Sequence, residues 1–587
     1  MKRHLYLFIL VLTALSGAKV SAQDATPSPS PTPPVVDAQK VQPENLQGVP
    51  DIAAGYRSDD RALPDLGRVG VDMADQKPLT LSDAIALALE NNKDIEVTRK
   101  NVQIAEFDLK AYRGVYEPRL AGQTLYERAT LPNISFFSPS ITTVTTNNIV
   151  GNANLQAFLP KYGTVFTGAF NNTRAVTDNP VSIISPQYNS SLSFEVRQPL
   201  LRGRRFDLNR RNIEVAKKNL SLTDSQFRQR AIDTITNVQR AYWDLTYALR
   251  NLQVQRDGVR DAKEQLVHNK RLVDEGQLAP IDVIAADTQV ANFEQAVYDA
   301  LNTVNLAENN LKNLISPDRN NKIWSESVTP VDPVSLDVPN TTLPEALGLA
   351  LQNRPELEQN DTQKEINKLD QRYYKELTKP QIDLTASYTS AGVGGSLNPN
   401  FTNPLLAGCA ADPTLPQCQS APVNQAALLN SVGSGGTAYT DILTNKYPTY
   451  RVGVTFNLPL FGDRTSHAQL GRSLVEGERL QTQREQIEQN IQVEVRNALQ
   501  TLRTAEARLR AAAIARENSA KQYESEQRKL DAGQSDVYKV LERQTALTTA
   551  RSTELRAQTE LNKAIADLQR ATGNSLKANN IEARLKR

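Results

Sequence analysis

Two cysteines carry the chemistry that is easiest to name in this sequence. Cys409 and Cys418 lie nine positions apart in a stretch rich in Pro, Gly and Ala, PLLAGCAADPTLPQC. A metal site would need more ligands, and the three histidines are scattered, at His4, His268 and His467. In an exported protein, two cysteines so placed are typical of a local disulfide. We therefore expect no metal site and, if the chain is exported, a Cys409–Cys418 disulfide.

The N-terminus indicates export. Lys2 and Arg3 precede a short apolar run, and the small residues VSA end at Ala22, as in a secretory signal peptide. The sequence predicts a signal peptide at 1–22. The segment 23–70 begins with many Pro, Ser and Thr residues and is expected to be disordered.

Composition and motifs exclude several function classes. The 587 residues include 67 basic and 65 acidic side chains, a balance that gives no general attraction for nucleic acid. No Gly-rich phosphate loop, nucleophile motif or histidine cluster occurs in the sequence, so we expect neither an enzyme nor a bound cofactor. No segment after the signal peptide approaches the 18 apolar residues of a spanning helix, so a membrane crossing would have to use β-strands.

The sequence contains an internal repeat. Residues 81–96 read LSDAIALALENNKDIE and residues 343–358 read LPEALGLALQNRPELE, and the same offset aligns Pro118 with Pro380. A second offset aligns Gly276 with Gly533, together with the apolar positions of two long heptad patterns. We divide the chain into a first repeat at 71–320, a linker at 321–341, a second repeat at 342–573 and a flexible tail at 574–587.

Each repeat combines helices with strands. Apolar spacing predicts helices at 82–114, 207–273, 281–315, 344–377 and 465–531, the last leading into a second hairpin that ends near 573. Each long helix has about 67 residues, or roughly 100 Å at 1.5 Å per residue. Alternating patterns predict strands within 118–200 and at 380–390 and 449–460, with a loop over 391–447 between the last two.

The strand count poses a closure problem. We expect four strands, with residues 150–175 either adding two more or folding outside the sheet. A membrane barrel needs at least eight strands, because an open edge is not tolerated in lipid. One chain therefore cannot close a barrel, and three chains of four strands would give twelve.

Several motifs resemble the TolC family of outer-membrane efflux proteins. They are LTLSDAIALALENN with its echo, AYWDL at 241–245, QPLLRG at 198–203, NLPLFGD at 457–463 and the turns DEGQLAPIDV and DAGQSDVYKV. The resemblance covers roughly 79–573. It implies a mainly α protein with a membrane β-barrel portion: a homotrimer with a twelve-stranded barrel in outer-membrane lipid and a helical tunnel through the periplasm. It also implies a passive duct for drug efflux or type I secretion, with an inner-membrane transporter and a periplasmic adaptor as partners.

The resemblance also assigns roles to residues. The hairpin turns at Gly276 and Gly533 would contact the adaptor and form the pore entrance. The family places acidic residues six and nine positions after the second glycine, where this chain has Lys539 and Glu542. Asp282, six positions after Gly276, keeps the pattern, so it could pair with Lys539 and hold the entrance shut. Two more acids lie near the second turn, Asp531 and Asp536. Whether the ring of charge is acidic or mixed stays open, and each residue could be an ordinary solvated loop charge.

The sequence leaves two alternatives. One is a periplasmic adaptor or other interaction protein without a pore, although an adaptor would carry one helical hairpin and this chain has two. The other is a secreted structural coiled coil. Only the channel is expected to enter the outer membrane and to require detergent.

Overall fold

The computed structural model describes residues 67–134, 141–334, 337–403, 412–414, 416, 418, 432–459 and 462–581. The expected signal peptide 1–22, residues 23–66 and Cys409 lie outside the described residues. The expected disorder over 23–70 is wrong at its end, because Arg68 is buried and paired with Glu308. The prediction of a Cys409–Cys418 disulfide therefore stays a prediction.

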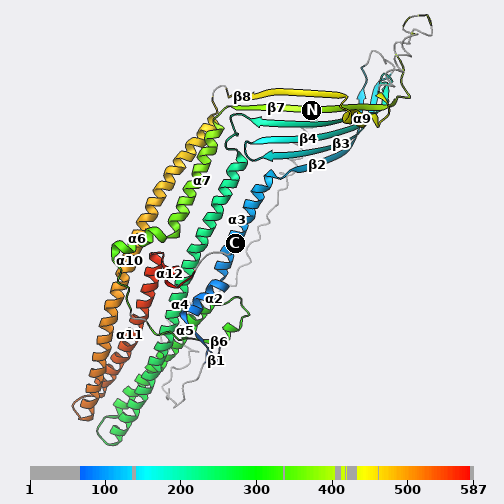
Figure 1. The fold of residues 1–587 in the computed structure, drawn as a ribbon. Helices are drawn as coiled ribbons and strands as arrows, with labels where there is room; N and C mark the ends of the chain where they lie inside the picture. Colours follow the sequence, from blue (N-terminus) through cyan, green and yellow to red (C-terminus); the bar gives the residue numbers. More distant parts are fainter. Residues whose placement is uncertain are drawn as a thin grey trace, which may run out of the picture. The chain divides into compact units, whose positions relative to one another are not determined.

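Two helical hairpins dominate the fold (Figure 1). In the first, α4 (Leu208–Asp274) is followed by α5 (Pro280–Ile315), and in the second α10 (Arg464–Asp531) is followed by α11 (Val537–Ala571). The expected bounds of α4, α5 and α10 differ from these by one residue at most. The heptad positions are buried as that pattern predicts: Ile235, Val238, Tyr242, Leu245, Ile491, Val495 and Leu502.

The two shorter helical segments are each broken in two, which corrects the expected single helices 82–114 and 344–377. The first consists of α2 (Leu81–Asn91) and α3 (Lys93–Arg113), and the second of α6 (Leu343–Asn353) and α7 (Pro355–Leu377). The breaks fall at Asn92 and Arg354, equivalent positions of the two repeats, and both residues have extended backbones. Pro355 disfavours a helical residue before it, and the Asn92 side chain caps α3 by accepting from the backbone of Asp94.

Six strands form one antiparallel sheet in the order β2-β3-β4-β5-β7-β8. Their bounds are Arg119–Pro132, Thr143–Leu159, Thr164–Thr177, Ile184–Pro199, Gln381–Leu397 and Tyr447–Asn457. The segment 150–175 thus adds two strands, which settles the alternative that the sequence left open. The repeat accounts for the other four, since β2 corresponds to β7 and β5 to β8. The hairpin β3–β4 is therefore an insertion in the first repeat.

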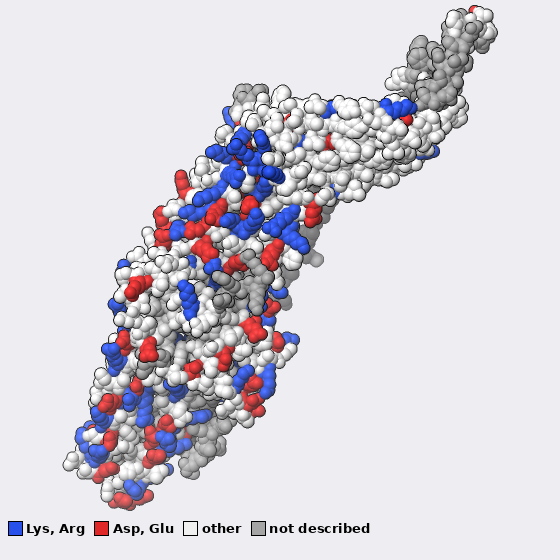
Figure 2. Space-filling model, in the orientation of Figure 1, with Lys and Arg blue, Asp and Glu red and all other residues white. Residues whose placement is uncertain are grey.

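The sheet has one apolar and one polar face. Directly paired residues share a face, and one face carries Phe166, Phe194, Leu384, Val452 and Phe456, among others. The other carries Thr167, Glu195, Ser387 and Arg451 in the corresponding strands. Lys, Arg, Asp and Glu are sparse over the sheet and frequent over the helices (Figure 2).

A short helix, α9 (Thr437–Leu443), lies within the region expected to be a loop at 391–447. It packs on β7, which itself extends to Leu397. Gly392 and Gly394 permit this contact, since an added Cβ would lie 1.9 Å from the Ala438 carbonyl oxygen and 2.3 Å from that of Ser434.

Both ends of the described chain are held by the helices. Near the first, β1 (Asp72–Leu79) pairs in parallel with β6 (Glu326–Pro330), so the expected linker 321–341 contains a strand. Near the second, α12 (Ser575–Ala578) lies in the expected tail, and its Leu576 packs in a cluster with Ile95 and Phe227.

Short 3-10 helices span Gly114–Tyr116 and Lys322–Trp324. No helix of the described residues is long and apolar enough to span a membrane.

Candidate functional site

The two hairpin turns have the same geometry. Gly276 and Gly533 have φ of +74° and +69°, in the left-handed region that glycine adopts without strain. In each turn the residue after the glycine donates its backbone N–H to a carbonyl five residues earlier, Gln277 to Leu272 and Gln534 to Lys529, both at 2.8 Å. This is the Schellman end of an α-helix. The repeat therefore builds two equivalent turns at the ends of α4 and α10.

The charged residues after the glycines cap the returning helices. The Asp282 carboxylate accepts from the Ala279 backbone N–H at 3.2 Å at the start of α5. Asp536 is the N-cap of α11 and accepts from the Lys539 backbone N–H at 2.9 Å. Both acids thus have a local structural role, so their presence alone does not establish a pore charge.

Lys539 pairs with Asp536 rather than with Asp282. Its ammonium lies 2.8 Å from the Asp536 carboxylate, and both side chains are more than half exposed. The hydrogen bond from Lys539 lowers the pKa of Asp536, and the same contact raises the pKa of Lys539. Among the described residues no ion pair joins Asp282 to Lys539 within the chain, so the predicted pair could form only between chains.

Asp531 and Glu542 lie in different surroundings. Asp531, the last residue of α10, is 3.1 Å from the ring of His268 in α4. Glu542 lines a groove of about 800 Å³ between α5, α10 and α11. The rest of the lining consists mainly of Ala and Thr, with Leu541 and Tyr538 at the same end. The four predicted charges of the second turn therefore do not form one cluster.

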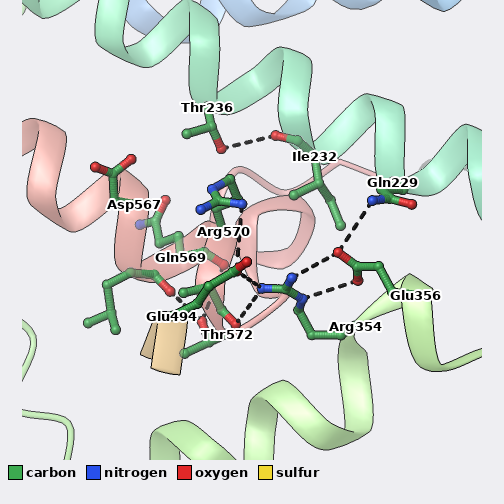
Figure 3. Close-up of polar contacts among 12 residues, drawn as sticks. Gln229, Ile232, Thr236, Arg354, Glu356, Glu494, Asp567, Gln569, Arg570 and Thr572 are labelled. Atoms are coloured by element: carbon green, nitrogen blue, oxygen red, sulfur yellow. Dashed lines mark hydrogen bonds and ion pairs between the residues drawn. The ribbon is translucent and has the colours of Figure 1, made fainter. Parts of the chain in front are cut away.

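A polar junction at the second helix break was not predicted (Figure 3). The buried Arg354 side chain contacts Glu356 at 2.8 Å and Glu494 of α10 at 2.7 Å, and donates to the Ala571 carbonyl of α11 at 3.3 Å. Gln229 of α4 donates to Glu356 at 3.3 Å. The break thus joins four helices, and the sequence NRPEL with its Pro355 was the signal that could have located it.

The sequence also provided no indication of a buried charge network near the C-terminal end of α5. Glu308 and Lys312 of α5 are fully buried, with Arg68 almost so. Glu308 accepts from Arg68 at 2.7 Å and from the Val328 backbone of β6 at 2.8 Å, and Lys312 donates to the Glu326 carbonyl at 2.7 Å. Burial lowers the pKa of Lys312, and the carboxylate of Glu308 opposes that shift. This network attaches the β1–β6 sheet to α5. In the sequence these charged residues look like surface charges, and only their contacts in the structure show that they are buried.

The comparisons with known proteins match both repeats. The model of the outer membrane efflux protein family covers residues 84–316 and 346–574. The chain belongs to the outer membrane efflux protein family. No curated protein sequence matches it significantly.

Solved structures support the family fold. The outer-membrane channel OprN is 15% identical, with a TM-score of 0.58 over 88% of this chain and 98% of that one. The CmeC outer membrane channel of Campylobacter jejuni is 16% identical, with a TM-score of 0.56 over 86% and 90%. The outer membrane protein VceC of Vibrio cholerae is 12% identical, with a TM-score of 0.56 over 84% and 96%.

The expected fold and location are therefore confirmed. This efflux protein is mainly helical with an added sheet, as the TolC resemblance implied, and it lies in the outer membrane and extends into the periplasm. The family is one of passive efflux channels rather than of enzymes.

Proposed function

We propose that three copies of this efflux protein form a passive exit duct, through which an inner-membrane transporter exports drugs or a type I secretion substrate. A periplasmic adaptor couples the transporter to the turns at Gly276 and Gly533. The sheet carries the proposal: it has an apolar face and a polar face, and among the described residues neither of its edges is paired with another strand. Such a sheet is stable in lipid only when its edges are paired.

The hairpins supply the reach that coupling requires. Helices of 67 and 68 residues extend for about 100 Å at 1.5 Å per residue. They carry the two turns far from the sheet, into the compartment where an adaptor acts.

A direct test is mass spectrometry of the detergent-purified protein under native conditions. We expect a trimer, and a stable membrane-inserted monomer would contradict the proposal. The adaptor contact is tested with photo-crosslinking residues placed at Gln277 and Gln534, next to the two turns. We expect them to capture a periplasmic protein in intact cells, whereas the same probe at Lys521, on the side of α10, serves as the matched control.

The two transport roles make different predictions for cells that lack the gene. In drug efflux, the cells become sensitive to toxic small molecules and their secreted proteins do not change. In type I secretion, a protein disappears from the culture medium instead. Unchanged drug sensitivity and secretion would contradict both roles.

A further inference from the structure

We propose that the membrane barrel of the trimer has eighteen strands, closed by β2 of each copy pairing with β8 of the next. The inference rests on the proposed trimer, and it departs from the twelve strands that the family resemblance implies. It concerns the edges of the sheet and the width of the duct. The partner is a second copy of this chain.

The strand order permits head-to-tail closure. Every neighbouring pair from β2 to β8 is antiparallel, and the described residues contribute six strands to this sheet. An even number leaves the two edge strands running in opposite directions, so β8 of one copy meets β2 of the next in the antiparallel sense. The inserted hairpin β3–β4 adds two strands and preserves this parity, which a single added strand would not.

The insertion cannot lie outside the sheet. β3 and β4 are interior strands, and β2 is joined to the sheet only through β3. The pairs of β3 with β4 run without a break from Thr146–Thr177 to Leu159–Thr164. A barrel that omitted this hairpin would have to break continuous ladders on both of its sides.

The sheet already has the slant of a closed barrel. Paired residues lead from Arg119, the first residue of β2, across the sheet to β8 through Gln156, Thr167, Glu195, Ser387 and Arg451. The distance from this line to the helix-side end of each strand grows steadily. It is zero residues in β2, three in β3 and β4, four in β5 and six in β7 and β8.

This slant fixes a register for closure. If the helix-side ends lie at one level, Asn457 of one copy pairs with Arg119 of the next, a stagger of six residues for six strands. With strands about 4.8 Å apart and a rise of about 3.4 Å per residue, that is a tilt of about 35°. Closed barrels have tilts of about 35–45°, so the same geometry that aligns the ends also closes the ring.

The two edges match in this register. On the apolar face, Tyr126 of β2 lies directly opposite Tyr450 of β8, and both rings are largely exposed in the single chain. On the polar face, Glu127 lies diagonal to Arg451, within reach of long side chains. Within the part of the chain that the structure describes, Arg451 forms no ion pair, so its guanidinium is available to Glu127 of the neighbouring copy.

Eighteen strands imply a wider duct than twelve. At a tilt of about 35°, the barrel diameter between strand axes is about 34 Å for eighteen strands and about 23 Å for twelve. The hairpin β3–β4 would therefore set the width of the duct in the membrane.

Disulfide crosslinking tests the edge contact. Cysteines replace Tyr126 together with Pro448, Tyr450 or Val452 in turn, in a Cys409→Ser/Cys418→Ser background that removes the native cysteines. After oxidation of outer membranes, we expect covalent trimers in denaturing gels, strongest for Tyr126→Cys/Tyr450→Cys. The single variants and Tyr126→Cys/Phe456→Cys, six residues out of register on the same face, are controls that should stay uncrosslinked.

The strand number is measured by the distance between copies. A spin label at Leu155→Cys of β3, in the same background, reports the spacing of equivalent residues in the trimer by pulsed electron resonance. Backbone spacings are about 29 Å for eighteen strands and about 20 Å for twelve, and an outward label lengthens both. A spacing near the shorter value, or a trimer with no β2–β8 crosslink, overturns this inference and leaves the proposed duct standing. A monomer in native mass spectrometry overturns both.

Discussion

Among single residues, Glu308 is the one whose removal we expect to cost most. Glu308→Leu leaves Arg68 and Lys312 buried without their acid, and an uncompensated buried charge costs about 3–5 kcal/mol. The urea midpoint of the purified protein should fall clearly. The matched control is Glu517→Leu, which breaks an exposed pair with Lys521 in the same i,i+4 arrangement and should change little. Equal effects of the two changes would show that the buried network does not stabilise the fold.

The charge at the second turn gives a prediction about ion flow. Lys539→Glu removes the partner of Asp536 and places two acids together, so it should raise conductance and cation preference in planar bilayers. Glu542→Gln should weaken that preference. Lys521→Glu makes the same charge change on the side of α10 and should leave both quantities unchanged. If Lys539→Glu has no more effect than this control, the turn does not line the narrow part of the pore.

At the scale of elements, the sequence predicted the long helices better than the breaks in the shorter helices or the number of strands in the sheet. The heptad pattern located α4 and α10 within a residue because each has a continuous apolar seam. The breaks at Asn92 and Arg354 were missed because a single extended residue hardly disturbs apolar periodicity. β3 was uncertain because its apolar face includes Asn147 and Gly151 and its polar face includes Val150, which weakens the alternating pattern. The pairing of β1 with β6 depends on contacts across more than 240 residues, which no local pattern reveals.

Of the candidate site, the sequence could predict the turns but not the contacts. Gly276 and Gly533 stand at the positions that need a left-handed backbone, and aligned repeats reveal that requirement. That Lys539 binds Asp536 instead of Asp282 follows from side-chain reach within one helical turn. Pro355 could have located the helix break at Arg354, but the contacts of the junction could not be predicted, because they come from four helices of both repeats.

The turns themselves can be tested by substitution. Gly533→Ala forces a Cβ into the left-handed region, at a local cost of about 1–2 kcal/mol, although no atom lies near enough to clash. Hydrogen exchange should speed up at the end of α10 and the start of α11, with the distant Arg354 junction unaffected. Gly533→Asn should be milder, since Asn tolerates this conformation. Equal exchange in all three proteins would show that the turn needs no glycine.

The helix α9 offers a test of a close contact. Gly392→Ala places a methyl group 1.9 Å from the Ala438 carbonyl oxygen, so α9 must leave its place on β7. We expect limited proteolysis to cut near residues 432–445 more readily in this variant. Gly453→Ala in β8 is the matched control, because its nearest contact would be 3.7 Å away. An unchanged cleavage pattern would mean that β7 or α9 can yield without separating.

For the whole molecule, the helices and the sheet depend on assembly to different degrees. The helical hairpins bury their seams within one chain, as Leu245 of the first and the clusters around Ile491 and Leu561 of the second show. In a single chain, every residue of β8 is exposed, as is every residue of β2 except Ala129. In lipid, the unpaired edges of the sheet must be paired with another strand. Helix content should therefore survive dissociation better than strand content.

Heating the trimer in detergent puts this coupling to the test. We expect the loss of the β signal in circular dichroism to coincide with the conversion of trimer to monomer in unboiled gels, with part of the helical signal remaining beyond that midpoint. Glu127→Arg places a cation near Arg451 of the neighbouring copy and should lower both midpoints together. Adding Arg451→Glu restores opposite charges and should recover them, whereas Arg510→Glu, an exposed change on α10, should leave them in place. A monomer that retains its full β signal above the dissociation temperature would show that the sheet is stable with open edges, and the physical reason for assembly through β2 and β8 would then be lost.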